Sequence, residues 1–98
     1  MKTFVTYRLA VEFYRLVKTV KTETHLKTQL LRAASSIVLN CGEGYGRRTH
    51  ADRRRHFSIA FGSLRESQAA LEIAEVKDEN ILDLADHIGG CLYKLCRL

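Results

Sequence analysis

Five arginines lie within nine residues in the middle of the chain, and they are the residues whose type and spacing best suit a binding chemistry. They stand beside two histidines, His50 and His56. A guanidinium group is planar and permanently charged, and its fork of donors matches the geometry of a phosphate. The cluster therefore predicts a site for nucleic acid or another polyanion. The contacts we expect come from six residues: Arg47, Arg48, Arg53, Arg54, Arg55 and His56.

Two other interpretations of the arginine cluster remain open at this stage. Residues 1–56 hold twelve lysines and arginines against four acidic residues, a net charge of +8, whereas residues 57–98 hold four against seven, a net charge of −3. The cluster is therefore also compatible with a solvated charged turn, or with ion pairs to the acidic half of a neighbouring subunit. A basic surface attracts phosphates and acidic proteins alike. The acidic candidates are Glu72, Glu75, Asp78 and Glu79.

A second group of polar residues lies in the two helical segments on either side of the arginines. If these segments are antiparallel about a turn near residue 48, Arg32 falls opposite Glu66 and Gln29 falls opposite Gln68. A charged group in a half-buried interface needs a partner. We therefore predict a structural polar network that sets the register of the two helices. Its members are Gln29, Arg32, Asn40, Glu43 and Glu66.

The residue types needed for covalent or metal chemistry are present but are not arranged for it. The serines of the helical segments have no histidine or lysine base beside them in the sequence. Asp83 and His87 are one helical turn apart, but no third ligand is near them, and Cys41, Cys91 and Cys96 lack the spacing of a zinc site. We therefore expect no enzymatic activity, no metal site and no cofactor.

Four segments with helical periodicity must position these residues. The chain contains no proline, the residue that most strongly breaks helices. Apolar residues recur every three or four positions, which is typical of amphipathic helices. We predict helices at residues 5–20, 25–43, 51–77 and 80–97. Short connections between such helices favour an all-α, up-down-up-down antiparallel four-helix bundle, built as a single domain of residues 1–98.

Several positions predict how the helices end and pack. Thr49 is expected to cap the third helix, with Asp52 three residues later, and Asn80 is expected to cap the fourth. Gly44 or Gly46 is expected to end the second helix in a left-handed conformation.

The second and third helices carry further packing signals. In mid-helix, Gly62 costs roughly 1 kcal/mol against alanine, which suggests a close contact there. The second helix carries two apolar stripes, which implies two buried faces. One stripe is a candidate for either a subunit contact or a contact across the bundle, and it consists of Leu31, Ala34, Val38 and Cys41.

The composition also bears on location. Three cysteines, an odd number, lie in apolar helical patterns, which indicates reduced thiols and therefore a cytoplasmic protein. The N-terminal apolar pattern is interrupted by Arg8, Glu12 and Arg15, which argues against a signal peptide. No apolar run approaches the length that spans a bilayer, so we expect no membrane partner.

A longer pattern resembles that of a known family. It begins with Gln29-x-x-Arg32-Ala33-Ala34-x-Ser36-Ile37-x-x-Asn40-x-x-Glu43-Gly44-Tyr45-Gly46-Arg47 and continues with Phe57-x-x-Ala60-x-Gly62-Ser63-x-x-Glu66. This order of residues resembles the four-helix-bundle family of 23S ribosomal RNA intervening-sequence proteins. That family is related to the accessory variability determinant of diversity-generating retroelements. The resemblance covers about residues 7–97.

The resemblance implies a small cytoplasmic bundle that assembles as a homopentamer. The related determinant is a basic pentamer that binds a reverse transcriptase and nucleic acid. The resemblance therefore implies nucleic acid, and a reverse transcriptase or another nucleic-acid enzyme, as partners. The chain departs from the family pattern at Gly42, where alanine is usual, and at Arg53–Arg55, which is more basic than usual.

Together, the arginine cluster and the resemblance predict a non-enzymatic, basic, oligomeric scaffold that binds RNA or DNA. The alternative is a structural or protein-interaction bundle with no role in nucleic-acid binding. The two hypotheses differ in what the arginines contact, which is a phosphate backbone in the first and a neighbouring subunit in the second.

Overall fold

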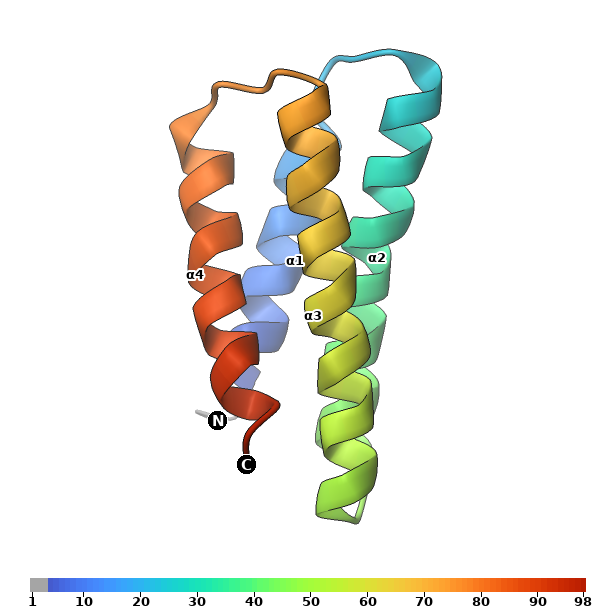
Figure 1. Ribbon diagram of the computed structural model, residues 1–98, viewed down its shortest axis with the longest axis vertical. Helices are drawn as coiled ribbons and strands as arrows, with labels where there is room; N and C mark the ends of the chain where they lie inside the picture. The colour runs from blue at the N-terminus through green and yellow to red at the C-terminus, as the bar shows by residue number, and fades with distance from the viewer. Residues whose placement is uncertain (1–3) are drawn as a thin grey trace.

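The computed structural model describes residues 4–98, so the first three residues of the predicted domain lie outside it. It contains four helices, α1 (Val5–Val17), α2 (Thr24–Gly46), α3 (His50–Ile73) and α4 (Glu79–Leu95), and the described part of the chain has no strand. The helices lie side by side and run alternately up and down (Figure 1). The predicted all-α class is confirmed, and the helices form the expected antiparallel arrangement.

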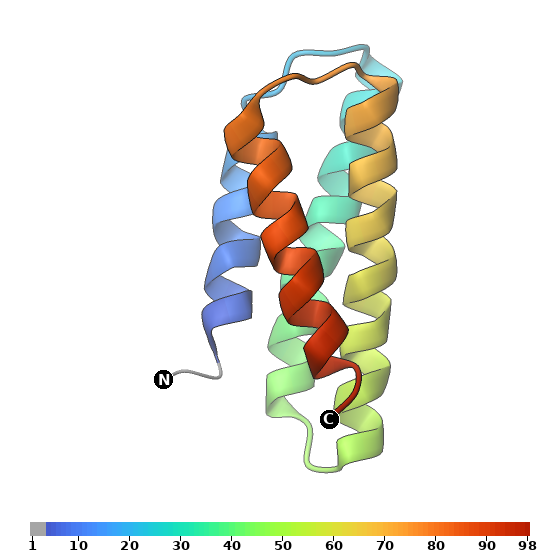
Figure 2. The same ribbon diagram turned by 60° about the vertical axis from the view of Figure 1, so that its left-hand side comes forward.

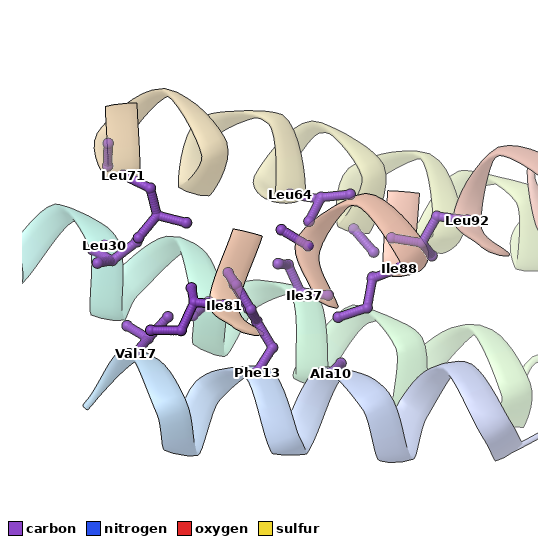
Figure 3. Packing of buried hydrophobic residues seen from close by; sticks show 14 of the residues in the cluster. Ala10, Phe13, Val17, Leu30, Ile37, Leu64, Leu71, Ile81, Ile88 and Leu92 are labelled. Atoms are coloured by element: carbon purple, nitrogen blue, oxygen red, sulfur yellow. The ribbon is translucent and has the colours of Figure 1, made fainter. Parts of the chain in front are cut away.

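A single hydrophobic core runs along the axis between the four helices (Figure 3). Phe13 from α1, Ile37 from α2, Leu64 from α3 and Ile88 from α4 have no exposed surface. Burying a side chain of this size contributes about 1.5–3 kcal/mol relative to leaving it in water. The core therefore supplies most of the driving force that holds the helices together.

The two central helices are also the longest, with 23 residues in α2 and 24 in α3. Their connection projects beyond the ends of α1 and α4 in both views (Figures 1 and 2). The connection between α3 and α4 lies at the opposite end of the molecule. The bundle, about 40 Å long and 22 by 18 Å across, is therefore closed by different connections at its two ends.

The helix termini confirm one predicted cap and correct two. The hydroxyl of Thr49 accepts a hydrogen bond from the Asp52 amide at 3.1 Å, as expected for the start of α3. At the start of α4 the cap is Asp78, not Asn80, because the Asp78 carboxylate accepts from the Asn80 amide at 2.9 Å. No glycine in the described residues has a positive φ, and the extended residue Arg47 ends α2.

The end of α3 is a third correction, because the helix stops at Ile73 and not near residue 77. Glu75 adopts a left-handed conformation with φ 58°, which bends the chain out of the helix. The Val76 amide then donates to the Leu71 carbonyl and the Glu75 amide to the Glu72 carbonyl, both at 3.0 Å. These bonds form a Schellman motif, in which a glycine is the usual left-handed residue. Because Glu75 and not glycine occupies this position, nothing in the sequence indicated that the helix ends here.

The second apolar stripe of α2 is divided between the core and the surface. Ala34 and Cys41 are buried within the chain, whereas Leu31 and Val38 are half-buried. Leu39, next to this stripe, is 67% exposed. Ala34 and Cys41 thus serve the contact across the bundle, and only Leu31 and Val38 remain partly available for a subunit contact.

Close packing requires glycine at position 44 and not at position 62. A Cβ atom at Gly44 would lie 2.6 Å from a ring carbon of Phe57, a separation that atoms cannot adopt without movement. A Cβ atom at Gly62 would meet nothing within 4 Å, and this residue is exposed. The close contact expected at Gly62 is therefore wrong within the chain, and the contact that does exist is between Gly44 and Phe57.

We predict opposite effects for alanine at these two glycines. Gly44→Ala should lower the free energy of unfolding by about 1–3 kcal/mol, because the Phe57 ring must shift to admit the methyl group. Gly62→Ala should raise it by up to about 1 kcal/mol, because alanine is the better helix former and its methyl group faces open space. Urea denaturation measures both values. A loss of stability at Gly62 that equals the loss at Gly44 would contradict this assignment.

Candidate nucleic-acid interface

The predicted arginines lie at the projecting end of the bundle. We call residues 47–55 the arginine turn, which comprises the α2–α3 connection and the first residues of α3. The Thr49 cap fixes the residue at which α3 begins. Arg47 and Arg48 therefore lie just before the helix, and Arg53–Arg55 lie in its first turns. All five side chains are exposed: Arg47, Arg48, Arg53, Arg54 and Arg55.

The arginines are tied to the protein mainly through main-chain oxygens. Arg53 Nε donates to the Arg47 carbonyl at 2.7 Å, and Arg54 Nη1 donates to the Leu98 carbonyl at 2.8 Å. Within residues 4–98 the only ion pair joins Arg47 to Glu43, with 2.8 Å between Nη2 and Oε2. Both side chains of this pair are about half exposed, and such surface pairs contribute about 0–1 kcal/mol. The arginine turn thus carries a concentrated positive charge with little internal compensation.

The acidic residues named as alternative partners lie far from this turn within the chain. They flank the α3–α4 connection, which is at the other end of the bundle (Figures 1 and 2). Screening by salt reduces interactions beyond roughly 8–10 Å at physiological ionic strength. The basic and acidic ends of one chain therefore do not neutralise each other.

Four of the five residues predicted to form the structural polar network are exposed: Gln29, Arg32, Glu43 and Glu66. No ion pair joins Arg32 to Glu66 in the described residues, so this predicted pairing is wrong. The physical reason is that Arg32 and Glu66 are both exposed, because small residues such as Ala33, Ala34 and Ala60 occupy buried positions of α2 and α3.

A different polar network connects α2 to α3, and only Asn40 belongs to both. Its amide nitrogen donates to the Ser36 carbonyl at 2.9 Å and contacts the Ser36 hydroxyl at 3.2 Å. That hydroxyl lies 2.7 Å from the Ser63 hydroxyl on α3. The amide oxygen of Asn40 lies 3.2 Å from Nδ1 of His56. No buried side-chain nitrogen or oxygen in the described part of the chain lacks a partner, which is what a stable polar core requires.

His56 belongs to this network, and its predicted place among the phosphate-binding residues needs correction. The residue is only 8% exposed. Its Nδ1 faces the Asn40 oxygen, and its Nε2 lies 3.4 Å from Nη2 of Arg55. The tautomer that satisfies both contacts donates from Nδ1 to Asn40 and accepts from Arg55 at Nε2. His56 thus contacts the Arg55 guanidinium through Nε2, and its own side chain is shielded from solvent.

A signal for this arrangement was present in the sequence. Residues 56, 60, 64 and 67 follow the helical spacing of a buried stripe, and all four are buried. That stripe passes through His56, Ala60, Leu64 and Ser67 and not through the half-buried Phe61 and Gln68.

We predict that the network stabilises the protein through Asn40 and not through Arg32. Asn40→Ala should lower the free energy of unfolding by about 1–3 kcal/mol, because His56 and Ser36 lose a buried hydrogen-bond partner. Arg32→Ala should change it by no more than about 0.5 kcal/mol, since the side chain is exposed. Denaturant titration of both variants tests this. Equal losses of unfolding free energy in the two variants would instead favour the network predicted from the sequence, which included Arg32.

Beside the arginine turn lies a cleft of about 350 Å³. Its aromatic wall is a row of three rings, in which Tyr45 meets Phe4 and Phe57 edge to face with centroids 5.2 Å apart in both cases. We call it the aromatic cleft, and its lining residues are Phe4, Tyr45, His50, Arg53, Arg54, Phe57, Leu95 and Leu98. Burial raises the pKa of the Tyr45 phenol, so this ring adds no negative charge near neutral pH.

The thiols do not form a second site. Burial raises the pKa of Cys41 to about 12, with smaller contributions from Cys91 and Cys96, so this thiol is a poor nucleophile at neutral pH. All three cysteines are free. Residues 4–98 contain no group of three histidine, cysteine, aspartate or glutamate side chains placed to hold a metal ion. None of the helices in this range is both long and apolar enough to cross a membrane.

Comparison with known proteins gives one match. The sequence model of the 23S rRNA-intervening sequence protein family matches residues 5–88. This range includes α1, α2, α3 and the arginine turn, together with the Asn40–His56 contact. Searches of curated proteins and of solved structures found no match.

Proposed function

Because the chain belongs to the 23S rRNA-intervening sequence protein family, we propose that it is a non-enzymatic scaffold that binds nucleic acid through the arginine turn. The observation that carries the proposal is the set of five exposed arginines at the projecting end of the bundle. Only Arg47 has a carboxylate partner within the described residues, and that partner is weakly held. The remaining guanidinium groups keep donors free for phosphate oxygens.

A phosphate backbone complements this surface for two reasons. Each guanidinium offers five N–H donors in a planar fork, so a single bond to a main-chain carbonyl leaves several donors unused. Binding also releases the counterions condensed on the nucleic acid, which makes the interaction favourable and strongly dependent on salt. We expect both RNA and DNA to bind, because the backbone contacts carry no sequence information.

The position of the acidic residues favours this proposal over ion pairing between subunits. We propose that the chain assembles as a homopentameric ring, in line with its resemblance to the intervening-sequence proteins. If the ring axis is roughly parallel to the bundle, all arginine turns lie on one side and all α3–α4 connections on the other. Such a ring joins five basic ends into one surface and keeps them away from the acidic residues of neighbouring subunits.

Exposed apolar residues support self-association. Leu39 and Ile73 are 67% and 66% exposed, respectively, and a groove of about 190 Å³ lies beside Leu39 between α1 and α2. A contiguous apolar surface, such as the groove beside Leu39, is a common mark of a contact with another protein chain. We expect light scattering to give five times the chain mass of 11.2 kDa. A particle with the mass of one chain would contradict the ring.

We propose no catalytic step, because the serine hydroxyls are engaged in structural contacts. Ser35 and Ser67 donate to carbonyls of their own helices, and Ser36 and Ser63 contact each other. Within residues 4–98, none of these four hydroxyls makes a hydrogen bond to a histidine or lysine base, as nucleophilic catalysis requires. A nucleic-acid enzyme, such as a reverse transcriptase, is the protein partner we propose on the basis of the resemblance.

Removing three arginines should separate the two hypotheses. We predict that the combined substitution of Arg53, Arg54 and Arg55 by alanine weakens binding to generic RNA and DNA. The slope of log affinity against log salt should fall by about one for each lost phosphate contact. The measurement is a fluorescence-anisotropy titration at several salt concentrations.

A matched control removes the same charge elsewhere. Arg8, Arg15 and Arg32 are also exposed but lie on α1 and α2, away from the arginine turn. Their replacement by alanine should leave the salt slope nearly unchanged. Equal losses in both triple variants would show that only net charge matters, and an absence of binding by the native protein at low salt would refute the proposed function. Dissociation of the oligomer on loss of the turn arginines would favour ion pairing between subunits.

A further inference from the structure

We propose that the aromatic cleft takes an unpaired nucleobase, so that the protein binds single-stranded nucleic acid in preference to a duplex. This inference rests on the proposed function, since the phosphate contacts of the arginine turn must bring the strand to the cleft. It adds a second component of binding, which depends on the base and not on the backbone. The sequence pattern showed only Tyr45 and Phe57 as aromatic residues near the arginines, whereas the fold adds Phe4 and two leucines.

The aromatic wall has the properties of a stacking surface. Phe57 is only 4% exposed and forms the fixed end of the row, where its ring packs against Gly44. Tyr45 is half-buried, and Phe4 is 38% exposed, so the row becomes more accessible toward Phe4. Aromatic side chains stack on any base, because every base has a π face. An accessible ring held by a buried one is therefore ready to stack without much loss of freedom.

The charges around the cleft match the other part of a nucleotide. Arg53 and Arg54 border the cleft, and each is held at its position by one hydrogen bond to a main-chain carbonyl. His50 is the third polar residue of the lining, and no aspartate or glutamate is among the lining residues. An apolar aromatic surface beside two guanidinium groups suits a ligand with a flat ring and an adjacent phosphate.

A second cleft in the same molecule shows that, of these two clefts among the described residues, an aromatic wall beside arginines occurs only at the end that carries the arginine turn. It also measures about 350 Å³, but its lining has three carboxylates (Glu72, Glu75 and Asp86) against one lysine, Lys77, and no aromatic ring. A phosphate would be repelled there. Two clefts of equal volume thus differ in the features that a nucleotide requires, and only the aromatic cleft adjoins the arginine turn.

The size of the aromatic cleft determines whether it can accept a base from a single strand or from a duplex. Its volume is at the lower end of the roughly 300–1,000 Å³ found for small-molecule sites. It can therefore admit a single base but not a base pair within a double helix. Bases in a duplex are stacked on their neighbours, and removing one from the stack costs a few kcal/mol. An unpaired base avoids this cost, which favours a single strand.

The first test uses the native protein and three labelled probes of equal length. These are an oligouridylate, an abasic ribose-phosphate oligomer and a fully paired RNA duplex. We expect the oligouridylate to bind at least about fivefold more tightly than the abasic oligomer, because each stacked base adds affinity. Equal affinities for these two probes would overturn the inference and leave the proposed function intact. If none of the three binds at low salt, the proposed function itself fails.

The second test removes the aromatic character of the cleft. Tyr45→Leu keeps an apolar side chain at this position and should lower the affinity for the oligouridylate about fivefold or more, while affinity for the abasic oligomer stays the same. Tyr93→Leu is the matched control, since Tyr93 is 52% exposed on α4 and does not line the cleft. An equal loss for both probes would indicate a structural effect of Tyr45 and would overturn the inference.

A rescue variant provides a signal that a structural role would not produce. The chain contains no tryptophan, so Tyr45→Trp places a single fluorophore in the cleft. We expect this variant to retain the affinity for the oligouridylate and to lose fluorescence on binding it, with no such change on binding the abasic oligomer. If Tyr45→Leu does not fold, Phe4→Leu removes a more exposed ring of the same wall and should weaken base-dependent binding. Unchanged fluorescence with the oligouridylate would contradict stacking at Tyr45.

Discussion

The close packing of α2 against α3 is the constraint on which the rest of the structure depends. Ala33 and Ala34 on α2 and Ala60 on α3 are buried, and Gly44 leaves space for the Phe57 ring. Because the side chains are small, the helices approach closely and exclude long polar residues from their interface. The polar contacts that remain are short ones, of which the Asn40–His56 pair is the clearest. The same packing places Tyr45 in edge-to-face contact with Phe57 and so forms the wall of the aromatic cleft.

The arginine turn is a consequence of the same constraint. A short connection between two closely packed helices has little interior of its own, so consecutive charged residues must face outward. Concentrating like charges at one corner is unfavourable for folding, and proteins tend to retain such local conflicts at functional sites. The hydrophobic core and the capped start of α3 maintain the turn in spite of this repulsion. A polyanion would relieve the repulsion, which is the physical link between the fold and the proposed function.

The aromatic cleft shows how the fold joins distant parts of the chain. Phe4 precedes α1, Tyr45 and Phe57 belong to the central pair of helices, and Leu95 is the last residue of α4. These segments meet at one end of the bundle because the helices alternate in direction (Figures 1 and 2). Membership of the family does not identify a ligand. The ligand we propose follows from the chemistry of the residues at that end.

The sequence by itself determined the number of helices, their approximate bounds, the Thr49 cap and the fact that at least some of the clustered arginines lie outside the core. Periodicity records which face of a helix is apolar, and three consecutive arginines cannot all be buried. Only the tertiary structure decided that His56 is buried, that Arg32 and Glu66 do not pair, and that a cleft adjoins the turn. These features depend on the distance and rotation between neighbouring helices. Side chains from several segments together determine this distance and rotation, so neither can be predicted from a single stretch of sequence.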